Sequence, residues 1–401
     1  FYRSVTASVS EESEDTNDTP QSEMMDSEVS VLLHCAAWSG LLESQVQVEL
    51  SESFNRKTDP ALERQIEEVW TERVSKEPWL FNGSKFRLHS FCLASSSSVS
   101  PKHPCAEDQK VECTSDQNSC HIPVDQAENT DHQEAAPLLT LRLGLTCYKD
   151  YLGTNWSCQV SELRQLGEVK FSDPLALLAQ PLGVGGIVCT DDGQVVLIRR
   201  SQKVAEAGGL LDIPGGHPEP KVRRNKVNEV SLTCLMCYLH RCCLPQVVCE
   251  RLGLEVCEEQ IRVDMMQQRP VVSELFSSVC AEIRDEVNIP LSSLGQPVLM
   301  GVALNHTSAG RPSAEFYVSC SLTSDEVRKL YWKGGAEANE STDIVFLSRA
   351  ELLQLDRSSR LWSELCPSAK GAVLLYQAVK PDGQRCQNRP RDTQLIVSED
   401  G

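Results

Sequence analysis

Two stretches, separated along the chain, decide how this sequence folds. The first is Leu211-Asp212-Ile213-Pro214-Gly215-Gly216-His217-Pro218-Glu219-Pro220, and the second is Ser273-Glu274-Leu275-Phe276-Ser277-Ser278-Val279-Cys280-Ala281-Glu282-Ile283-Arg284-Asp285-Glu286-Val287-Asn288. The first predicts a short strand that runs into a Gly-Gly turn, where the backbone can approach a neighbour closely because it carries no side chain. The second predicts a helix. Its acids Glu282, Asp285 and Glu286 are spaced by three and four residues, which places them on one helix face.

This acidic face has two interpretations. Like charges at such spacings repel each other and destabilise a helix. A bound Mg²⁺ would make the same cluster of carboxylates stabilising, because Mg²⁺ takes oxygen ligands and favours one or two carboxylates together with substrate phosphates. The alternative is a solvated acidic face without a ligand. The residues alone leave both open.

Taken together, the two stretches resemble the Nudix box. In that family a Gly and a Glu precede the run Arg-Glu-apolar-x-Glu-Glu-x-Gly-apolar. The chain departs from this pattern in four places: Ala281 stands for the Arg, Asp285 for the first Glu of the pair, Asn288 for the final Gly, and Val222 for the early Glu. Asn tolerates the left-handed conformation that ends helices, so the change at 288 is mild. The insertion that follows Gly216 is the larger departure.

Other runs extend the resemblance to the animal UDP-glucose pyrophosphatase branch of the Nudix superfamily. They are residues 78–81, 85–90, 152–156, 305–318 and 365–372. The resemblance covers most of residues 25–94 and 137–378. It implies an Mg²⁺-dependent hydrolase that cleaves UDP-glucose, and similarly UDP-galactose, to UMP and the sugar 1-phosphate.

The same resemblance implies the fold class and the domains. The class is α/β (α+β): a Nudix α/β/α sandwich with a mixed sheet, preceded by a smaller N-terminal α+β domain that helps to enclose the substrate. The predicted segments are an acidic disordered extension at 1–27, the N-terminal domain at 28–180 with a disordered insert at 95–136, the Nudix domain at 181–379 with an insertion at 221–262, and a loose tail at 380–401.

Catalytic residues carry over to the acidic helix. The resemblance implies that Glu282, Asp285 and Glu286 are catalytic and that Glu282 and Glu286 hold the Mg²⁺. Asp285 would support the metal or position the attacking water. Hydrolysis of a diphosphate needs both a metal, to neutralise phosphate oxygens, and an activated water.

Eight further positions correspond to substrate contacts in this branch. They are Phe81, Tyr148, Arg200, Ala205, Asp212, His217, Glu219 and Ser368. Arg200 would pair with a phosphate. The competing interpretation is ordinary structure: core packing for the two aromatic residues, a solvated strand end for Arg200, turn hydrogen bonds for Asp212 and His217, and a helix cap for Ser368.

Hydrophobic periodicity predicts the remaining elements. Strands are expected at 29–33, 85–90, 137–146, 297–304, 314–322 and 342–347, and helices at 59–77, 324–330 and 369–379. A hairpin is expected from strands at 184–188 and 195–198, because Thr190-Asp191-Asp192-Gly193 has the composition of a tight turn.

Composition narrows the functional classes. The net charge of −19 argues against a general nucleic-acid binder. No apolar run is long enough to span a bilayer, and residues 1–25 lack the basic start and apolar core of a signal peptide. We therefore expect no nucleic-acid or membrane partner and a cytosolic or nuclear protein that is not secreted. The sequence does not predict an oligomeric state.

Thiols concentrate in the insertion. Its Cys and His residues are Cys234, Cys237, His240, Cys242, Cys243 and Cys249. The second Cys pair is too close to the first for a usual zinc site, and the surroundings are apolar, so we predict no metal here. Residues 221–250 are basic and thiol-rich within an acidic chain, which suggests that they are not part of the ancestral domain.

Two other functions stay open from the sequence. A non-catalytic protein could bind nucleotide sugars with a degenerate box, and a Nudix pyrophosphatase could act on ADP-ribose or another nucleoside diphosphate derivative.

Overall fold

The computed structural model describes residues 27–94, 137–204, 206–220, 261–337 and 339–383. Some of the predictions fall outside the described residues. They concern the N-terminal extension up to residue 26, the insert at 95–136, Ala205, the insertion at 221–260 with its cysteine cluster, and the tail from residue 384.

The larger sheet in the described part of the chain has eight strands, six of which follow the order β1-β9-β10-β5-β6-β11. Their bounds are β1 Val29–His34, β5 Gly183–Cys189, β6 Gln194–Arg200, β9 Val298–Asn305, β10 Arg311–Ser319 and β11 Ser341–Ser348. β10 and β5 run parallel, while the other neighbours in this order are antiparallel. The predicted mixed sheet is confirmed.

Two very short strands bring the Gly-Gly turn onto this sheet. β7 (Leu211–Asp212) pairs with β6, and β8 (Gly215–Gly216) pairs with β5. The strand predicted before the turn therefore exists, although it is only two residues long. It places the turn beside the middle of the sheet.

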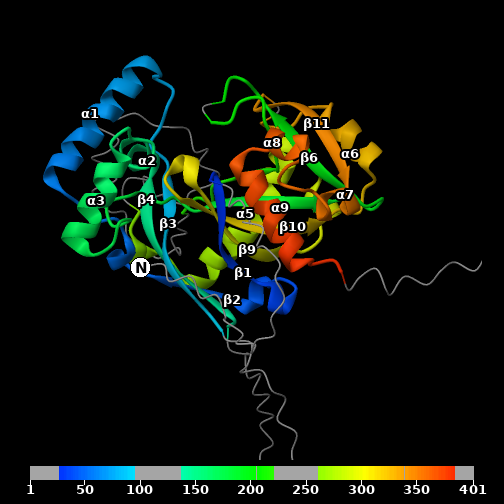
Figure 1. Ribbon diagram of the computed structural model, residues 1–401, viewed down its shortest axis with the longest axis horizontal. Helices are drawn as coiled ribbons and strands as arrows, with labels where there is room; N and C mark the ends of the chain where they lie inside the picture. Colours follow the sequence, from blue (N-terminus) through cyan, green and yellow to red (C-terminus); the bar gives the residue numbers. More distant parts are fainter. Residues whose placement is uncertain (1–26, 95–136, 205, 221–260, 338, 384–401) are drawn as a thin grey trace, which may run out of the picture.

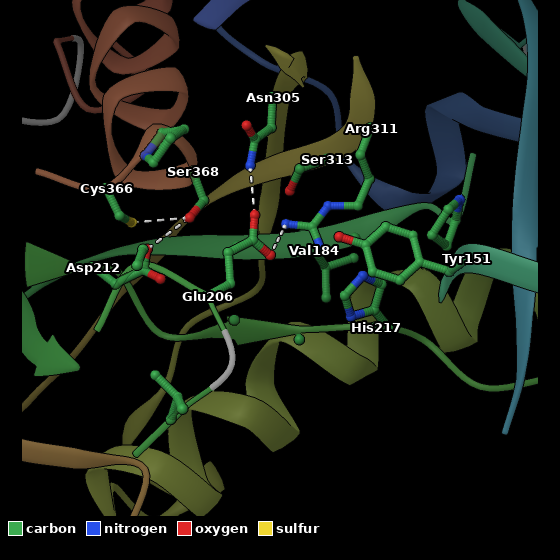
Figure 2. Close-up of a pocket in the computed structure, with 18 of the residues that line it drawn as sticks. Tyr151, Val184, Glu206, Asp212, His217, Asn305, Arg311, Ser313, Cys366 and Ser368 are labelled. Atoms are coloured by element: carbon green, nitrogen blue, oxygen red, sulfur yellow. Dashed lines mark hydrogen bonds and ion pairs between the residues drawn. The ribbon is translucent and has the colours of Figure 1, made fainter. Parts of the chain in front are cut away.

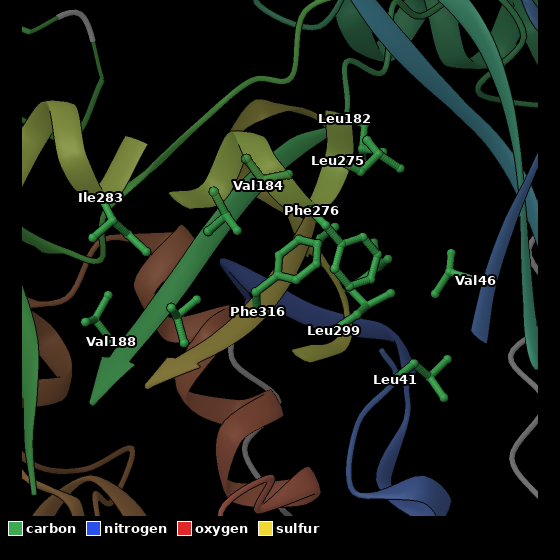
Figure 3. Close-up of a cluster of buried hydrophobic side chains, with 14 of the residues drawn as sticks. Leu41, Val46, Leu182, Val184, Val188, Leu275, Phe276, Ile283, Leu299 and Phe316 are labelled. Atoms are coloured by element: carbon green, nitrogen blue, oxygen red, sulfur yellow. The ribbon is translucent and has the colours of Figure 1, made fainter. Parts of the chain in front are cut away.

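Helices α5 (Gln268–Val287) and α9 (Pro367–Val379) cover opposite faces of the larger sheet (Figure 1). β10 shows why, because its side chains alternate between the faces. Phe316 packs edge-on against Phe276 of α5 with ring centroids 5.0 Å apart. Its neighbour Tyr317 stacks on Tyr376 of α9 at 6.3 Å. The result is the α/β/α arrangement, with one hydrophobic core on each face of the sheet. Figure 3 shows the core between the sheet and α5.

Three shorter helices complete this unit: α6 Ser324–Tyr331, α7 Arg349–Leu353 and α8 Arg360–Glu364. The first two begin with capping boxes, Thr323 with Glu326 and Ser348 with Glu351. In each box the two side chains satisfy backbone N–H groups that the first helical turn leaves unpaired.

The N-terminal part forms a smaller sheet in the order β2-β4-β3. Its elements are β2 Val46–Leu50, β3 Ser84–Leu93 and β4 Leu139–Cys147, with helices α1 Pro60–Lys76, α2 Tyr148–Gly153 and α3 Val160–Phe171. α1 begins where the Asp59 carboxylate accepts from the backbone N–H of Ala61 at 3.0 Å, a common way to start a helix.

The two sheets share one core. Val46 and Phe86 of the smaller sheet belong to the same buried cluster as Val272 and Phe276 of α5, so α5 lies between the sheets (Figures 1 and 3). β1 precedes the smaller sheet in sequence but pairs with β9 at the edge of the larger one. These contacts fix the N-terminal part against the side of α5.

The predicted strands, helices and hairpin are confirmed within the described residues. Five helices and strands were not predicted: β2, which is only five residues long, the short helices α2, α7 and α8, and α3, whose buried residues are only Leu163 and Gly167. Asn288 ends α5 with φ of 65°, the left-handed conformation that its position in the pattern predicts. No described helix is long and apolar enough to cross a membrane.

Candidate active site

The two halves of the split motif meet in space. The backbone N–H of Gly215 donates a hydrogen bond to the Glu286 carboxylate at 2.9 Å. A Cβ on Gly216 would lie 2.1 Å from Oε1 of Glu282, closer than any real Cβ contact. Gly216 therefore permits this approach to α5, while Gly215 permits a close approach to β5, where a Cβ would lie 2.5 Å from the backbone oxygen of Val184. The turn and the acidic helix are joined by direct contacts, whatever the intervening insertion does.

Burial and mutual repulsion dominate the electrostatics of the acidic helix. Glu286 is 5% exposed, and its pKa is raised well above the usual value, mainly by burial and further by Asp212 and Glu282. The pKa of Glu282 is raised to about 7 by burial and then by Glu337, Asp285 and Glu340. Carboxylates held in this way favour a cation among them.

A second acidic segment, which no sequence pattern had indicated, completes the cluster. One carboxylate oxygen each from Glu286, Glu337 and Glu340 lie within 4.8 Å of one another. Glu282 is outside this set, although its pKa responds to Glu337 and Glu340. Among the described residues, this set is the group of acidic side chains that lie close enough together to hold a metal ion. This is a different ligand set from the predicted pair of Glu282 and Glu286.

Contacts with α5 hold this second segment in place. The backbone N–H of Glu337 donates to the carbonyl oxygen of Asp285 at 3.0 Å. Gly335 packs against the same carbonyl so closely that a Cβ there would lie 2.5 Å from it. The Asp285 side chain is paired with Arg284 at 2.6 Å. The backbone carbonyl of Asp285 thus positions the loop that carries Glu337, while the Asp285 carboxylate is paired with the guanidinium of Arg284.

The acidic cluster fits a divalent metal ion. Its donors are all carboxylate oxygens, the ligands that hard divalent cations prefer, and one of them is buried and raised in pKa by its neighbours. A bound cation would relieve the repulsion that these residues otherwise experience.

A cavity of about 570 Å³ opens beside the cluster, with Glu286 and Glu340 in its wall. One end is aromatic and comes from the N-terminal part: Tyr148 stacks on Tyr151 with centroids 6.4 Å apart, and Trp156 lies alongside. The size suits a nucleotide-sized ligand.

The remaining wall, the polar end of the cavity, extends from Asp212 to Arg311, whose guanidinium lies 5.6 Å from the ring centroid of Tyr151 (Figure 2). Asp212 accepts from Ser368 at 3.0 Å and pairs with Arg200 at 2.9 Å. Glu206 pairs with Arg311 at 3.2 Å and accepts from Asn305 at 3.2 Å. Each of these guanidinium groups is thus held by an acid at a defined place on the wall.

Five of the eight predicted substrate residues line this cavity together: Tyr148, Arg200, Asp212, His217 and Ser368. His217 lies near Arg311 in Figure 2. Burial, followed by the charges of Arg311 and Lys85, lowers the pKa of His217 well below its usual value. Its imidazole is therefore neutral at physiological pH.

Two of the other three, Phe81 and Glu219, do not line the cavity wall. Phe81 is 50% exposed, and its ring lies beside Gly83 close to the Nζ of Lys85. Glu219 pairs with Lys85 at 2.8 Å. Because Lys85 itself lines the cavity, both residues lie at its edge. Ala205 is outside the described residues.

Comparisons with known proteins give the following matches. No protein-family model matches the chain. Uridine diphosphate glucose pyrophosphatase NUDT22 of Bos taurus is 42% identical over 356 residues, which is 89% of this chain and 99% of the relative. The protein of the same name from Mus musculus is 43% identical over 357 residues, covering 89% and 93%. Nudix hydrolase 9 of Arabidopsis thaliana is 29% identical over 370 residues, covering 92% and 95%. Among solved structures, a Nudix hydrolase from Alicyclobacillus acidocaldarius is similar over 52% of this chain and 95% of its own, with 11% identity and a TM-score of 0.29.

Proposed function

The chain belongs to the Nudix hydrolases, in the branch of the UDP-glucose pyrophosphatases named NUDT22, and on that premise we propose that it cleaves the diphosphate of UDP-glucose. UDP-galactose is the second proposed substrate. The products are UMP and the sugar 1-phosphate. One observation carries the proposal: the Gly-Gly turn and the acidic helix meet at the wall of a nucleotide-sized cavity.

Mg²⁺ is the proposed metal ion, because the donors are carboxylates and the substrate brings phosphate oxygens. Bound there, it supplies charge neutralisation for the diphosphate and a lowered pKa for a coordinated water. Glu286, Glu337 and Glu340 hold it on this proposal. Glu282 lies against Gly216 beside the cluster, and on this proposal its carboxylate is a further ligand of the metal ion.

Asp285 has a supporting role in the proposed mechanism. Its carbonyl fixes the Glu337 segment, and its carboxylate is committed to Arg284. The neighbouring acids remain close to the cavity, where they can orient a water that attacks a phosphorus atom. The protein therefore contributes a cluster of carboxylates that is held rigidly at one place on the cavity wall.

The cavity wall provides the proposed substrate contacts. Tyr148 offers a ring face for the base or the sugar. Arg200 supplies a guanidinium for a phosphate, oriented by its pair with Asp212. The neutral His217 and the Ser368 hydroxyl supply hydrogen bonds without net charge. Phe81, Glu219 and Ala205 belong to the same proposal, the first two as contacts at the cavity's edge.

We retain the predicted domains as part of the proposal, residues 28–180 as the smaller unit and 181–379 as the Nudix unit, with β1 of the first pairing into the larger sheet. Tyr148, Tyr151 and Trp156 support this division of labour, because they bring the smaller unit to the cavity that the larger one builds. The smaller unit would then help to select the nucleotide.

A substrate panel tests this function against the alternatives. Purified protein with Mg²⁺ is given UDP-glucose, UDP-galactose, ADP-ribose and coenzyme A, singly and in competition, and the products are separated by chromatography. We expect UMP and a sugar 1-phosphate from the UDP-sugars as the main products. Preferential release of AMP from ADP-ribose would show a different Nudix pyrophosphatase. UDP-glucose binding without any turnover would show a non-catalytic binder.

A further inference from the structure

Glu315 lies at the centre of the larger sheet and borders the cavity, and none of the roles above uses it. It is 0% exposed. Neither of its carboxyl oxygens makes a hydrogen bond of ordinary geometry in the described part of the chain, although the Ser313 hydroxyl is close enough to lower its pKa. Burial of a carboxyl group without a partner is strongly unfavourable. Its place beside a ligand cavity therefore calls for a partner that arrives with the ligand.

Glu315 has a glycine beside it on each neighbouring strand, and the glycine on β5 leaves room for its side chain. Its neighbour on β5 is Gly185 and its neighbour on β9 is Gly301. A Cβ on Gly185 would lie 2.4 Å from Oε2 of Glu315 and 2.7 Å from Cδ1 of Ile213. The carboxyl group thus occupies the space that a side chain on β5 would fill. The sheet is arranged around this group.

The charge state of Glu315 suits an uncharged partner. Burial raises its pKa to about 8; the nearby Ser313 hydroxyl and Arg311 lower it, whereas Asp212 raises it. At neutral pH the group is therefore largely protonated. A protonated carboxyl both donates and accepts a hydrogen bond, as an alcohol does.

The surrounding wall narrows the choice of ligand. Asp212, Glu206, Asn305 and Ser368 line the same polar end of the cavity (Figure 2). The two acids are each paired with an arginine, and the amide and hydroxyl beside them add further donors and acceptors. A group with several hydroxyls matches this mixture of acceptors and donors.

We propose that Glu315 forms a hydrogen bond with a hydroxyl of the hexose and thereby contributes to the recognition of the sugar. This inference rests on the proposed function, because it names the part of the UDP-sugar that the polar end holds. It makes Glu315 a specificity residue for the sugar, separate from the acids that gather the metal.

Two substitutions separate recognition from structure. Glu315→Met keeps the length of the side chain but removes its polar atoms, and Glu315→Gln keeps an uncharged donor and acceptor. Affinity for UDP-glucose and for UDP is measured by calorimetry with a chelator present, so that no turnover intervenes. Thermal unfolding is followed for each protein.

We expect Glu315→Met to weaken UDP-glucose binding by roughly ten- to one-hundred-fold and to leave UDP binding unchanged. Its Tm should stay equal or rise, because an unpaired buried carboxyl is gone. Glu315→Gln should bind UDP-glucose within about threefold of the original chain. Thr146→Val is the matched control: it also removes a buried hydroxyl without a partner, but away from the cavity wall, and should change neither affinity.

Unchanged UDP-glucose affinity in Glu315→Met overturns the proposal. An equal loss for UDP and UDP-glucose also overturns it, because the contact would then be with the nucleotide. If Glu315→Met does not fold, a structure of the unaltered protein with UDP-glucose decides, and a Glu315 carboxyl out of hydrogen-bond range of every hexose hydroxyl refutes it. The readout is binding, so a protein that binds UDP-glucose without cleaving it would refute the proposed hydrolysis alone.

Discussion

Gly216→Ala is the sharpest probe of how the two halves of the site fit together. The new Cβ would lie 2.1 Å from Oε1 and 2.4 Å from Cδ of Glu282. An ordinary contact of this kind is about 3.4 Å or more. The carboxylate therefore has to move by roughly 1.3 Å, the difference between about 3.4 Å and 2.1 Å, and a misplacement of about 1 Å in an active site can cost around one-hundred-fold in rate.

The same geometry predicts little loss of stability. The atoms that the new methyl group would displace belong to the end of a flexible side chain, and Gly216 is not among the residues with positive φ. We expect the free energy of unfolding to change by less than about 1 kcal/mol and kcat/KM to fall by about one-hundred-fold. UMP release and urea unfolding measure the two quantities.

Two control variants make the prediction for Gly216→Ala refutable. Gly215→Ala would place its Cβ 2.5 Å from the backbone oxygen of Val184, so it should lower stability where Gly216→Ala does not. The double variant Gly216→Ala with Glu282→Gln should be no slower than Glu282→Gln alone, since both act through one carboxylate. A folded Gly216→Ala with unchanged kcat/KM, or additive losses in the double variant, would refute the reasoning.

Three further predictions concern the metal, the pH dependence and the insertion. Glu340→Gln should weaken Mn²⁺ binding by roughly tenfold or more, because it removes one charged donor of the cluster; unchanged binding in a calorimetric titration would exclude this residue from the site. Because the folded pKa of His217 is depressed, the unfolded chain takes up a proton below about pH 6.5 that the folded chain does not. The contribution of His217 to stability should therefore be lost from pH 7 to pH 5, opposite in sign to the contributions of Glu282, Glu286 and Glu315, whose pKa values are raised. His217→Gln should accordingly be more stable at pH 5, relative to pH 7, than the unaltered chain in urea unfolding; an equal difference between the two pH values in both proteins speaks against a neutral imidazole. Replacement of residues 221–260 by a flexible linker should leave UMP release within about threefold, since a change of loop length alters closure entropy only modestly; complete loss of activity in a folded protein would show that the insertion takes part.

Local patterns were enough to identify the acidic helix and the turn. Glu282 and Glu286 are spaced so that a helix presents them together, and the Gly-Gly pair signals close backbone approach. The structure places both features in contact. Asn288 could also be assigned in advance, because few residues other than Gly tolerate a left-handed helix end.

Glu337 and Glu340 could not be found in this way. They lie in a polar loop whose only local signal is the Gly334-Gly335 pair before two acids. Their role depends on the packing of Gly335 and Glu337 against the end of α5, which is tertiary information. For the same reason the sequence did not indicate a role for Glu315, a single acid in an apolar strand. Its burial beside the cavity depends on its glycine neighbours on other strands.

Phe81 shows what a resemblance leaves open about a contact residue. Its correspondence to a contact position comes from the resemblance, yet its ring is half exposed at the cavity's edge. The exposure of a loop side chain depends on the conformation of the loop, which sequence spacing does not determine.

UMP release from UDP-glucose by the unaltered chain and by Glu286→Gln tests the central claim, that the split motif closes into a metal-dependent site. Glu274→Gln, an acid of the same helix outside the cluster, is the matched control. The account predicts equimolar UMP and glucose 1-phosphate with Mg²⁺, full loss on chelation, loss of at least about one-hundred-fold in Glu286→Gln, and no effect in the control. Binding of UDP-glucose without UMP release by the unaltered protein, or equal release by Glu286→Gln, would contradict it.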